Sequence, residues 1–328
     1  MLGEIEVPNE HTLLNSGGVY QISALLQSQM CYVGQQHVFT DASETFYKLL
    51  GIEVNAKQIE RVCHHYGEKL EEDIQKSIRT EMNEEHYTDD KSYYVMLDGG
   101  MVLTREEKWK EMKLGRIFEE NQNITISKGR GFIGSSTYIA HLGGHKDFLA
   151  KVEAHVDKMG NAIFIADGAK WIWKWVEAMY PESTQVLDFF HAKEHLCQWA
   201  GLAFKEEKQK QNWIHEQCMW LMNNKIERVI ENISHIKIYT KKARQCKRSL
   251  IEYYTENKER MRYKTYREKG LLIGSGPIEA AHRHVIQQRM KLSGQRWTKK
   301  GVQQIANLRV ANKSNQWHKV VELTSLAA

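Results

Sequence analysis

The sequence predicts an α/β fold in which a mixed sheet is flanked by helices. Five short apolar segments lie between residues 92 and 190, and glycines or polar turns follow most of them. The first three follow one another closely and the later ones alternate with helical patterns, which is typical of a sheet with antiparallel and parallel neighbours. Only three prolines occur in 328 residues, which favours long helices on both sides.

Residues 1–90 are predicted to form an N-terminal helical region. Its helical segments are "YQISALLQSQM", "DASETFYKLLG" and "NAKQIERVCHHYGEKLEEDI". We expect Asp41 or Ser43 to cap the second helix and Asn55 the third, because short polar side chains bind free N–H groups at helix starts. The turn "GIEV" is compatible with a DNA-binding helix-turn-helix, although an ordinary helical bundle has the same pattern. The acidic "NEEHYTDDKS" is predicted to be a linker.

Residues 91–192 carry the predicted sheet. Its strands are "YYVMLDGG", "KEMKLGRIF", "TYIAHLGG", "NAIFIADG" and "TQVLDFF", and "SKGRGFIGSS" is predicted to be a glycine-rich loop. Two helices separate the later strands. "KDFLAKVEAHVDKMG" is expected to end with Gly160 as its C-cap, and "AKWIWKWVEAMY" is ended by Pro181.

Residues 193–269 are helical throughout, and residues 270–328 form a C-terminal helical part. The helical run separates Asp167 from Glu279 by too many residues for one crossover, so it is predicted to be an α-helical insertion. The C-terminal part contains "GSGPIEAAHRHVIQQRMK". There, Pro277 suits the first helical position and Gly276 the cap.

The charge is unevenly distributed. Residues 241–320 contain 20 Lys/Arg and 5 Asp/Glu, although the whole chain has a net charge of only +5. No acid occurs between Glu279 and Glu322. Solvated helical faces normally mix both signs, so this basic third is predicted to face the phosphates of nucleic acid.

Other compositional features exclude several classes of protein. The five cysteines are odd in number and form no Cys-x-x-Cys pair, which argues against a disulfide or structural-zinc framework and for a reducing cytoplasm. No run of about 18 apolar residues is present, so no membrane span is expected. Residues 1–20 lack the basic head and apolar stretch of a secretory signal.

Three carboxylates are the main candidates for chemistry. Asp98 in "LDGG" and Asp167 in "ADGAK" are each predicted to close an apolar strand, where the sheet rim opens to ligands. Asp-Gly is also a common turn, so neither motif alone indicates a site. Glu279 adds a third carboxylate in a first helical turn, with His282 and Arg283 on its face. Carboxylates suit Mg²⁺, and two such ions can hold the attacking and leaving oxygens of a phosphodiester.

The arrangement of these residues resembles a known family. Asp98, Asp167 and Glu279 occur in the order of the DDE transposases, and the chain is most similar to bacterial insertion-sequence transposases of the Mutator-like superfamily, in the ISKra group. The resemblance spans residues 2–317. Its most specific segments are "MLDGGMV", "WKEMKLGRIF", "ADGAKWIW", "LDFFHAKEHL" and "IGSGPIEAAHRHVIQQRMKLSGQRW". The family carries a further N-terminal, cysteine-bearing segment that this sequence lacks, which suggests a shortened copy.

The resemblance implies a fold, an activity and a set of partners. The fold would be an RNase H-like mixed sheet with an α-helical insertion. Asp98, Asp167 and Glu279 would bind two Mg²⁺ or Mn²⁺ ions, and Asp188 and His191 would match an auxiliary Asp-x-x-His motif. The chain would cleave and join transposon-end and target DNA as a homo-oligomer, in the nucleoid-associated bacterial cytoplasm.

Further residues are candidates for DNA contacts, and some have alternative roles. The predicted DNA-binding residues are Lys170, His282, Arg283, Arg289, Lys291, Arg296 and Trp297. Trp297 either stacks on a base or packs in the core. His191 and His195, with Cys197 nearby, could hold zinc, but no second ligand pair accompanies them, which favours a general-base or DNA-contacting role for His191. The Trp171 and Trp175 side chains share a helical face, which favours core packing over base stacking.

Two alternatives to a transposase remain open from the sequence. An RNase H-like nuclease would cut DNA without joining it, and strand transfer separates the two activities. A non-catalytic or truncated DNA-binding remnant would retain the basic surface alone, and metal-dependent cleavage would exclude it.

Overall fold

A computed structural model describes residues 20, 22–81, 90–127 and 130–326. Its centre is a five-stranded mixed sheet with the order β5-β2-β1-β6-β7. β1 is antiparallel to β2 and parallel to β6, β2 is antiparallel to β5, and β6 is parallel to β7. The strands are β1 (Ser92–Thr104), β2 (Lys108–Glu119), β5 (Thr137–Leu142), β6 (Asn161–Ala166) and β7 (Thr184–Leu187). The predicted mixed α/β architecture is therefore confirmed.

The strands differ from the prediction in two places, one in the five-stranded sheet and one in a separate two-stranded sheet. β1 does not end at Asp98 but continues to Thr104, because β2 supplies an antiparallel partner along this whole stretch. The predicted loop after the second strand contains part of a small hairpin, formed by β3 (Asn123–Ser127) and β4 (Arg130–Ile133). Glycine-rich composition favoured a loop there, but the segments "NITI" and "GFI" pair as antiparallel strands.

Helices cover both faces of the sheet. Side chains alternate across a strand, so neighbouring residues of β2 identify the two faces. Arg116 donates to the Pro277 carbonyl oxygen at 2.8 Å on one face, where α11 (Gly276–Ala281) crosses. The Lys113 ammonium lies 5.6 Å from the ring centroid of Trp171 on the other face. That second face carries α4 (His145–Val156) and α5 (Lys170–Met179).

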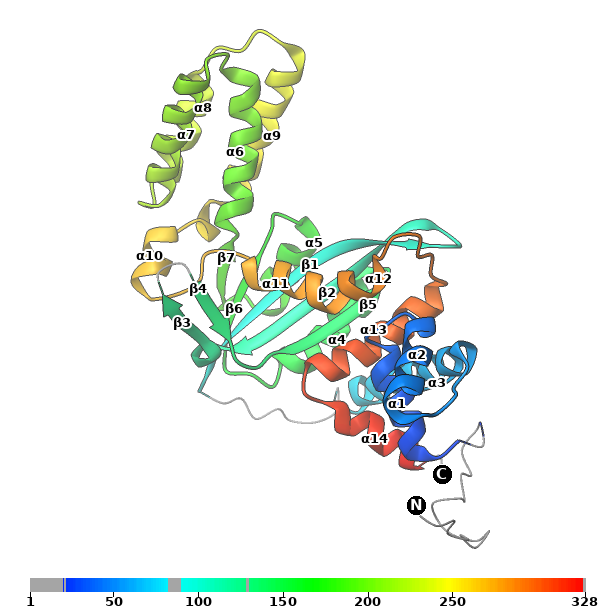
Figure 1. Cartoon of the computed structure of the whole chain (residues 1–328). Coiled ribbons are helices and arrows are strands. Elements are labelled where there is room, and N and C mark those ends of the chain that lie inside the picture. The colour runs from blue at the N-terminus through cyan, green and yellow to red at the C-terminus, as the bar shows by residue number, and fades with distance from the viewer. Residues whose placement is uncertain (1–19, 21, 82–89, 128–129, 327–328) are drawn as a thin grey trace, which may run out of the picture.

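The segment that crosses the first face is a continuous helical run. α11 is followed by a π-helical segment, η3 (His282–Gln287), and by α12 (Gln288–Met290), and Figure 1 shows the run in orange in front of the sheet. Its N-cap is Ser275 rather than Gly276, and a proline occupies the first helical turn as expected. α4 also ends earlier than predicted, because Asp157 and not Gly160 follows its last turn.

The N-terminal helices pack against the C-terminal ones. They are α1 (Ala24–Gly34), α2 (Phe39–Leu50) and α3 (Ala56–Glu81), and their partners are α13 (Lys299–Lys313) and α14 (Trp317–Leu326). α3 and α13 approach closely at Gly67, where a Cβ would lie 2.3 Å from the Gln304 carbonyl oxygen. The Asn55 side chain accepts a hydrogen bond from the Lys57 N–H at the start of α3, as predicted. For α2, neither predicted cap is used, because the helix begins earlier, at Phe39.

The predicted insertion is helical and stands away from the sheet. Its helices are α6 (Phe189–Ala203), α7 (Glu207–Leu221), α8 (Ile226–His235), α9 (Lys241–Asn257) and α10 (Tyr263–Glu268). Figure 1 shows α6 to α9 as a bundle that projects from the end of the sheet where β7 leads into α6. Within the described residues, no helix combines the length and apolarity needed to cross a membrane.

Candidate carboxylate site

Three aspartates lie at the same level on neighbouring parallel strands. The ladders end with the pairs Met96–Ile165, between β1 and β6, and Ala166–Leu187, between β6 and β7. Continuing the two registers brings Asp98 level with Asp167 and Asp167 level with Asp188. The carboxyl ends of parallel strands are where α/β sheets open to ligands. The sequence indicated Asp98 and Asp167 as a pair, and the sheet order makes Asp188 their neighbour.

Asp98 faces His282 of the helical run that crosses the sheet. Asp98 Oδ2 lies 3.4 Å from His282 Nε2, which is buried and has no hydrogen-bond partner among the described residues. Burial raises the pKa of Asp98, and the negative charges of Asp167 and Glu279 raise it further, against the opposing effects of His282 and the Gly99 N–H. Burial likewise lowers the pKa of His282. Both shifts disfavour the charged forms of Asp98 and His282, and a cation bound beside Asp98 would favour its ionised carboxylate.

Gly100 allows the helical run to lie this close to β1. A Cβ at Gly100 would lie 2.9 Å from Nδ1 of His282, which is closer than side-chain carbons normally approach other atoms. The absence of a side chain at Gly100 thus allows the helical run to pack against β1.

Glu279 and Asp188 are joined through Ser275. The Ser275 hydroxyl, which is buried, lies 2.6 Å from Asp188 Oδ2 and 3.1 Å from Glu279 Oε1. Asp188 Oδ1 also accepts the Phe190 N–H at 2.9 Å and so caps α6. Glu279 is exposed in the first turn of α11, as predicted. Asp188 therefore has a structural role that links β7 and α6 to the start of α11.

Asp167 borders a groove that leads into the insertion. Its Oδ1 accepts the Ala169 N–H at 2.9 Å, and its carbonyl oxygen accepts the indole N–H of Trp173. A cavity of about 730 Å³ begins at the neighbouring Gly168 and lies between α5, α6 and α9. Polar side chains along its walls include the basic Lys170 and Lys242, the acidic Glu252 and Glu256, and His195, Gln198, Gln245 and Ser249, and Lys170 forms an ion pair with Glu256 at 2.9 Å. This groove has the size of a site for an extended ligand, next to the carboxylates.

Tyr253 closes the inner end of the groove and was not indicated by the sequence. A Cβ at Gly168 would lie 2.0 Å from its ring. The Tyr253 hydroxyl is buried and has no hydrogen-bond partner among the described residues. Burial raises its pKa, and the charges of Asp167 and Asp188 raise it further. A tyrosine in a helical segment carries no sequence signal for this position, because only the fold brings α9 to the end of β6.

The donor chemistry of the carboxylates fits a hard divalent cation. Asp98, Asp167 and Glu279 supply oxygen ligands from three separate elements, and their charges oppose one another without a cation. Within the described part of the chain, no three His, Cys, Asp or Glu side chains are already arranged as a metal-binding group. Binding would therefore require side-chain rotation at the site, which the exposed Glu279 permits.

Four of the predicted DNA-binding residues are exposed, and three are not. Lys170, Arg283, Lys291 and Arg296 lie at the surface. His282, Arg289 and Trp297 are 4%, 1% and 8% exposed. His282 faces Asp98, and the Trp297 indole donates to the Met290 carbonyl oxygen, so Trp297 packs rather than stacks on a base. Arg289 is enclosed by aromatic rings, so His282, Arg289 and Trp297 lie in the interior rather than on the exposed surface in this conformation.

The histidines and tryptophans near the site have packing roles. His191 and His195 lie edge to face with ring centroids 4.9 Å apart, and His191 Nδ1 is 3.8 Å from a carboxylate oxygen of Glu194. Trp171 stacks on His145, and the Trp175 indole donates to Glu153. These contacts agree with the core-packing interpretation of the tryptophans.

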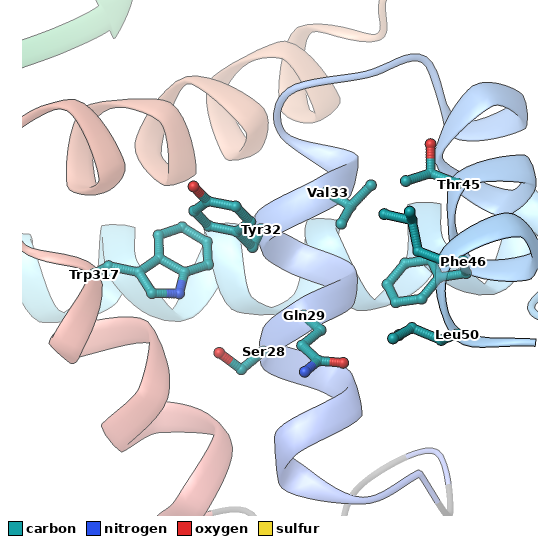
Figure 2. A pocket seen from close by; sticks show the side chains of 9 residues that line it. Ser28, Gln29, Tyr32, Val33, Thr45, Phe46, Leu50 and Trp317 are labelled. Carbon is teal, nitrogen blue, oxygen red and sulfur yellow. The ribbon is translucent and has the colours of Figure 1, made fainter. Parts of the chain in front are cut away.

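An apolar cavity lies far from the carboxylates, among the N-terminal helices. It has a volume of about 210 Å³ and is lined by α1, α2 and Trp317. Figure 2 shows Tyr32 beside Trp317 on one side of α1 and Val33 facing Phe46 and Leu50 on the other. Since its walls contain no charged side chain, this cavity lacks the groups needed for acid–base or metal chemistry.

Comparisons with known proteins give no family for the chain. No protein-family model matches the sequence, and no curated protein matches it. The arrangement of the carboxylates and the distribution of charge are therefore the basis on which a function is inferred.

Proposed function

We propose that the protein is a DDE-type DNA transposase of an insertion sequence. The observation that carries the proposal is the register of the sheet, which places Asp98 and Asp167 at the same level on neighbouring strands. Glu279, 112 residues after Asp167, acts on the same carboxylate of Asp98 through its charge. The charges of Asp167 and Glu279 raise the pKa of Asp98, and a divalent cation with carboxylate ligands would oppose that effect.

The fold supports this proposal. A five-stranded mixed sheet with helices on both faces and a helical insertion before the Glu279 helix is compatible with an RNase H-like core. We assign that core to the chain as part of the proposal, together with its kinship to the Mutator-like transposases of the ISKra group.

In the proposed mechanism, Asp98, Asp167 and Glu279 hold two divalent cations, Mg²⁺ or Mn²⁺. When bound, such ions polarise a phosphodiester and favour deprotonation of the attacking oxygen. The chain's own residues position these ligands. His282 packs against Asp98, and Ser275 fixes the start of the Glu279 helix to Asp188.

The proposed chemistry has two balanced steps. Water adds to the phosphorus at a transposon end, and the leaving 3′-oxygen takes a proton, which yields a 3′-hydroxyl and a 5′-phosphate. This 3′-hydroxyl then attacks a target phosphodiester, which forms a new P–O bond as the target 3′-oxygen leaves. Neither step needs a covalent protein intermediate.

Positive charge supports DNA as the partner. Residues 241–320 carry 20 Lys/Arg against 5 Asp/Glu. They include exposed Arg283 and Lys291 on the Glu279 helical run, so the cations lie on the element that carries the carboxylate. We propose a homo-oligomer on DNA in a bacterial cytoplasm, since two transposon ends must be processed together.

The test is incubation with DNA that flanks the coding sequence, with Mg²⁺ and with EDTA. The proposal predicts Mg²⁺-dependent nicks at the ends of the mobile element, followed by joined products. Cleavage without joined products would instead identify a nuclease. DNA binding without any cleavage would identify a non-catalytic remnant.

A further inference from the structure

A second polar cavity lies between the N-terminal helices and the C-terminal part of the basic third. Its volume is about 390 Å³. It is bounded by the start of α2, by α3, by the turn between β1 and β2, and by the loop before α13. The side chains that matter for its chemistry are those of Phe39, His64, Arg105, Arg289, Arg296 and Thr298. We call it the Arg289 pocket.

Arg289 is a buried cation held rigidly in this pocket. Its side chain is 1% exposed, and its guanidinium carbon lies 4.9 Å from the ring centroids of both Phe39 and Trp297. Nε donates to the Gly34 carbonyl oxygen at 3.2 Å. Nη2 is buried and has no hydrogen-bond partner among the described residues. The guanidinium is thus fixed in place with one donor unused.

The Arg289 charge is not balanced by an acid. Burial lowers its pKa to about 10, against the opposing effects of Cys63 and Asp41, so the side chain is charged at neutral pH. No ion pair to Arg289 occurs among the described residues. An unpaired charge in the interior is costly, and native proteins normally pair it or bind a counter-ion.

Two exposed arginines and a half-buried histidine add further donors to the pocket, and burial lowers the pKa of the histidine, His64. His64 Nε2 is buried without a hydrogen-bond partner among the described residues. Arg105 and Arg296 are exposed at the rim, where Arg105 Nε donates to the Arg296 carbonyl oxygen. The acid in the lining is Glu60, which forms an ion pair with Lys57 at 2.6 Å. The carboxylate in the lining is thus paired with Lys57, which lies outside the lining, and not with Arg289, Arg105 or Arg296.

We propose that the Arg289 pocket binds a phosphate group of the nucleic-acid backbone. Guanidinium forks suit the oxygens of phosphate, and an imidazole N–H adds a further donor. The source of the phosphate rests on the proposed function. Glu279 and Arg289 lie ten residues apart on one helical run, within about 15 Å along its axis, since a purely α-helical run rises 1.5 Å per residue and the π-helical η3 rises less. One DNA molecule can therefore contact the pocket a few nucleotides from the carboxylates.

Phosphate binding can be measured without turnover. Inorganic phosphate is titrated into the metal-free protein at constant ionic strength, with chloride as the reference anion, and the melting temperature and the heat of binding are recorded. We expect saturable binding by the wild-type chain. Arg289→Met should weaken it about tenfold or more, as expected for loss of a charge-assisted hydrogen bond. Arg267→Gln, an exposed arginine outside the pocket, should leave it unchanged.

A second variant keeps the test decisive if Arg289→Met fails to fold. The double variant Arg105→Gln/Arg296→Gln changes only exposed side chains and should also weaken phosphate binding. Absence of saturable binding in the wild type, or equal binding by the double variant, would overturn the proposal. Competition by an oligonucleotide supports the backbone as the source, and phosphate binding without competition overturns that assignment. These results do not depend on cleavage, so they are distinguishable from a failure of the proposed function.

Discussion

Glu279 is a single acid in a basic helical run, and its surroundings suggest why. The residue is exposed, lies in the first turn of α11, and is hydrogen-bonded to the Ser275 hydroxyl. A helix start places this carboxylate near the positive end of the helix dipole. In the proposed mechanism it would share a cation with Asp98 and Asp167.

Glu279→Gln should abolish cleavage while it leaves folding and DNA binding nearly intact. Glutamine preserves the size of the side chain and can still accept from Ser275, but it removes the charge that a divalent cation needs. The measurement is the Mg²⁺-dependent cleavage rate beside the melting temperature. Glu322→Gln, at an exposed position on α14, is the matched control and should cut normally. If Glu279→Gln cleaved DNA at the wild-type rate, Glu279 would serve only as a helix-capping residue.

The positions of single residues were predicted well where they follow from the local apolar pattern. Their burial was predicted poorly where it depends on contacts with distant segments. Asp98 and Asp167 follow apolar segments, so their place on the sheet could be expected from sequence. Arg289 and His282 occur in a basic helix, and composition alone favoured a solvated DNA surface for both. Their burial depends on Phe39 and on Asp98, which lie far away in the chain.

At the scale of elements, the contact between β1 and the helical run determines the geometry of the site. Gly100→Ala places a Cβ 2.9 Å from His282 Nδ1, so the helix must move away from the strand. We expect a loss of about 1–3 kcal/mol in the free energy of unfolding and a large loss of cleavage. Urea denaturation and the cleavage rate measure the two effects.

Gly276→Ala is the control for that substitution. A Cβ at Gly276 has no heavy atom within 4 Å, and the residue lies in the same helical run. Its stability and activity should stay near those of the wild type. If Gly100→Ala were equally harmless, the close contact of β1 and the helix would not be needed by the site.

A buried ion pair joins three helices and should control the response to acid. Lys151 on α4 is 2% exposed and lies 2.7 Å from Glu71 on α3, and Asn307 on α13 donates to the same carboxylate. Burial alone would raise the pKa of Glu71, but Lys151 and the hydrogen bonds lower it below its ordinary 4.5. The pair therefore adds stability above pH 4.5 that is lost as the pH falls through the lowered pKa.

Lys151→Met should cost about 3 kcal/mol at pH 7, because it leaves Glu71 partly buried without its cation. In this variant only burial and hydrogen bonds act on Glu71, and burial raises the pKa. Acidification should thus destabilise the wild type more than the variant, and their difference should shrink between pH 7 and pH 4. Urea midpoints at both pH values test this. A difference that stays constant with pH would show that the pair contributes only packing.

The order of the helices and strands was predicted more accurately than the residues at which they begin and end. Apolar segments and helical periods indicated the five strands and the helical insertion, because these patterns reflect burial directly. The continuation of β1 to Thr104 and the β3–β4 hairpin were missed, since antiparallel pairing with the next strand along the chain overrides local glycine content. The predicted N-cap, Gly276, lies one residue after the observed one, Ser275. The Ser275 hydroxyl donates to Asp188, a contact with a distant segment that the local sequence does not indicate.

For the whole molecule, charge distribution predicts how DNA binding depends on salt. Each phosphate contacted by a cation contributes a slope of about 0.9 in the dependence of log K on log salt. Lys291→Glu/Arg296→Glu should weaken binding to all sequences and reduce the slope by about 2. Lys205→Glu/Lys208→Glu, two exposed positions on the insertion, changes the net charge equally and serves as the control. An unchanged slope of log K against log salt in Lys291→Glu/Arg296→Glu would show that these two side chains do not contact DNA.

The central claim is that Asp98, Asp167 and Glu279 form one divalent-cation site. Its most direct test is the binding of Mn²⁺, measured by electron paramagnetic resonance in the absence of DNA and again with bound DNA. We expect the wild type to bind up to two Mn²⁺ ions. Asp98→Asn, Asp167→Asn and Glu279→Gln should each weaken Mn²⁺ binding by about tenfold or more, and Glu322→Gln should leave it unchanged. Equal Mn²⁺ binding by the wild type and all three site variants would contradict the account.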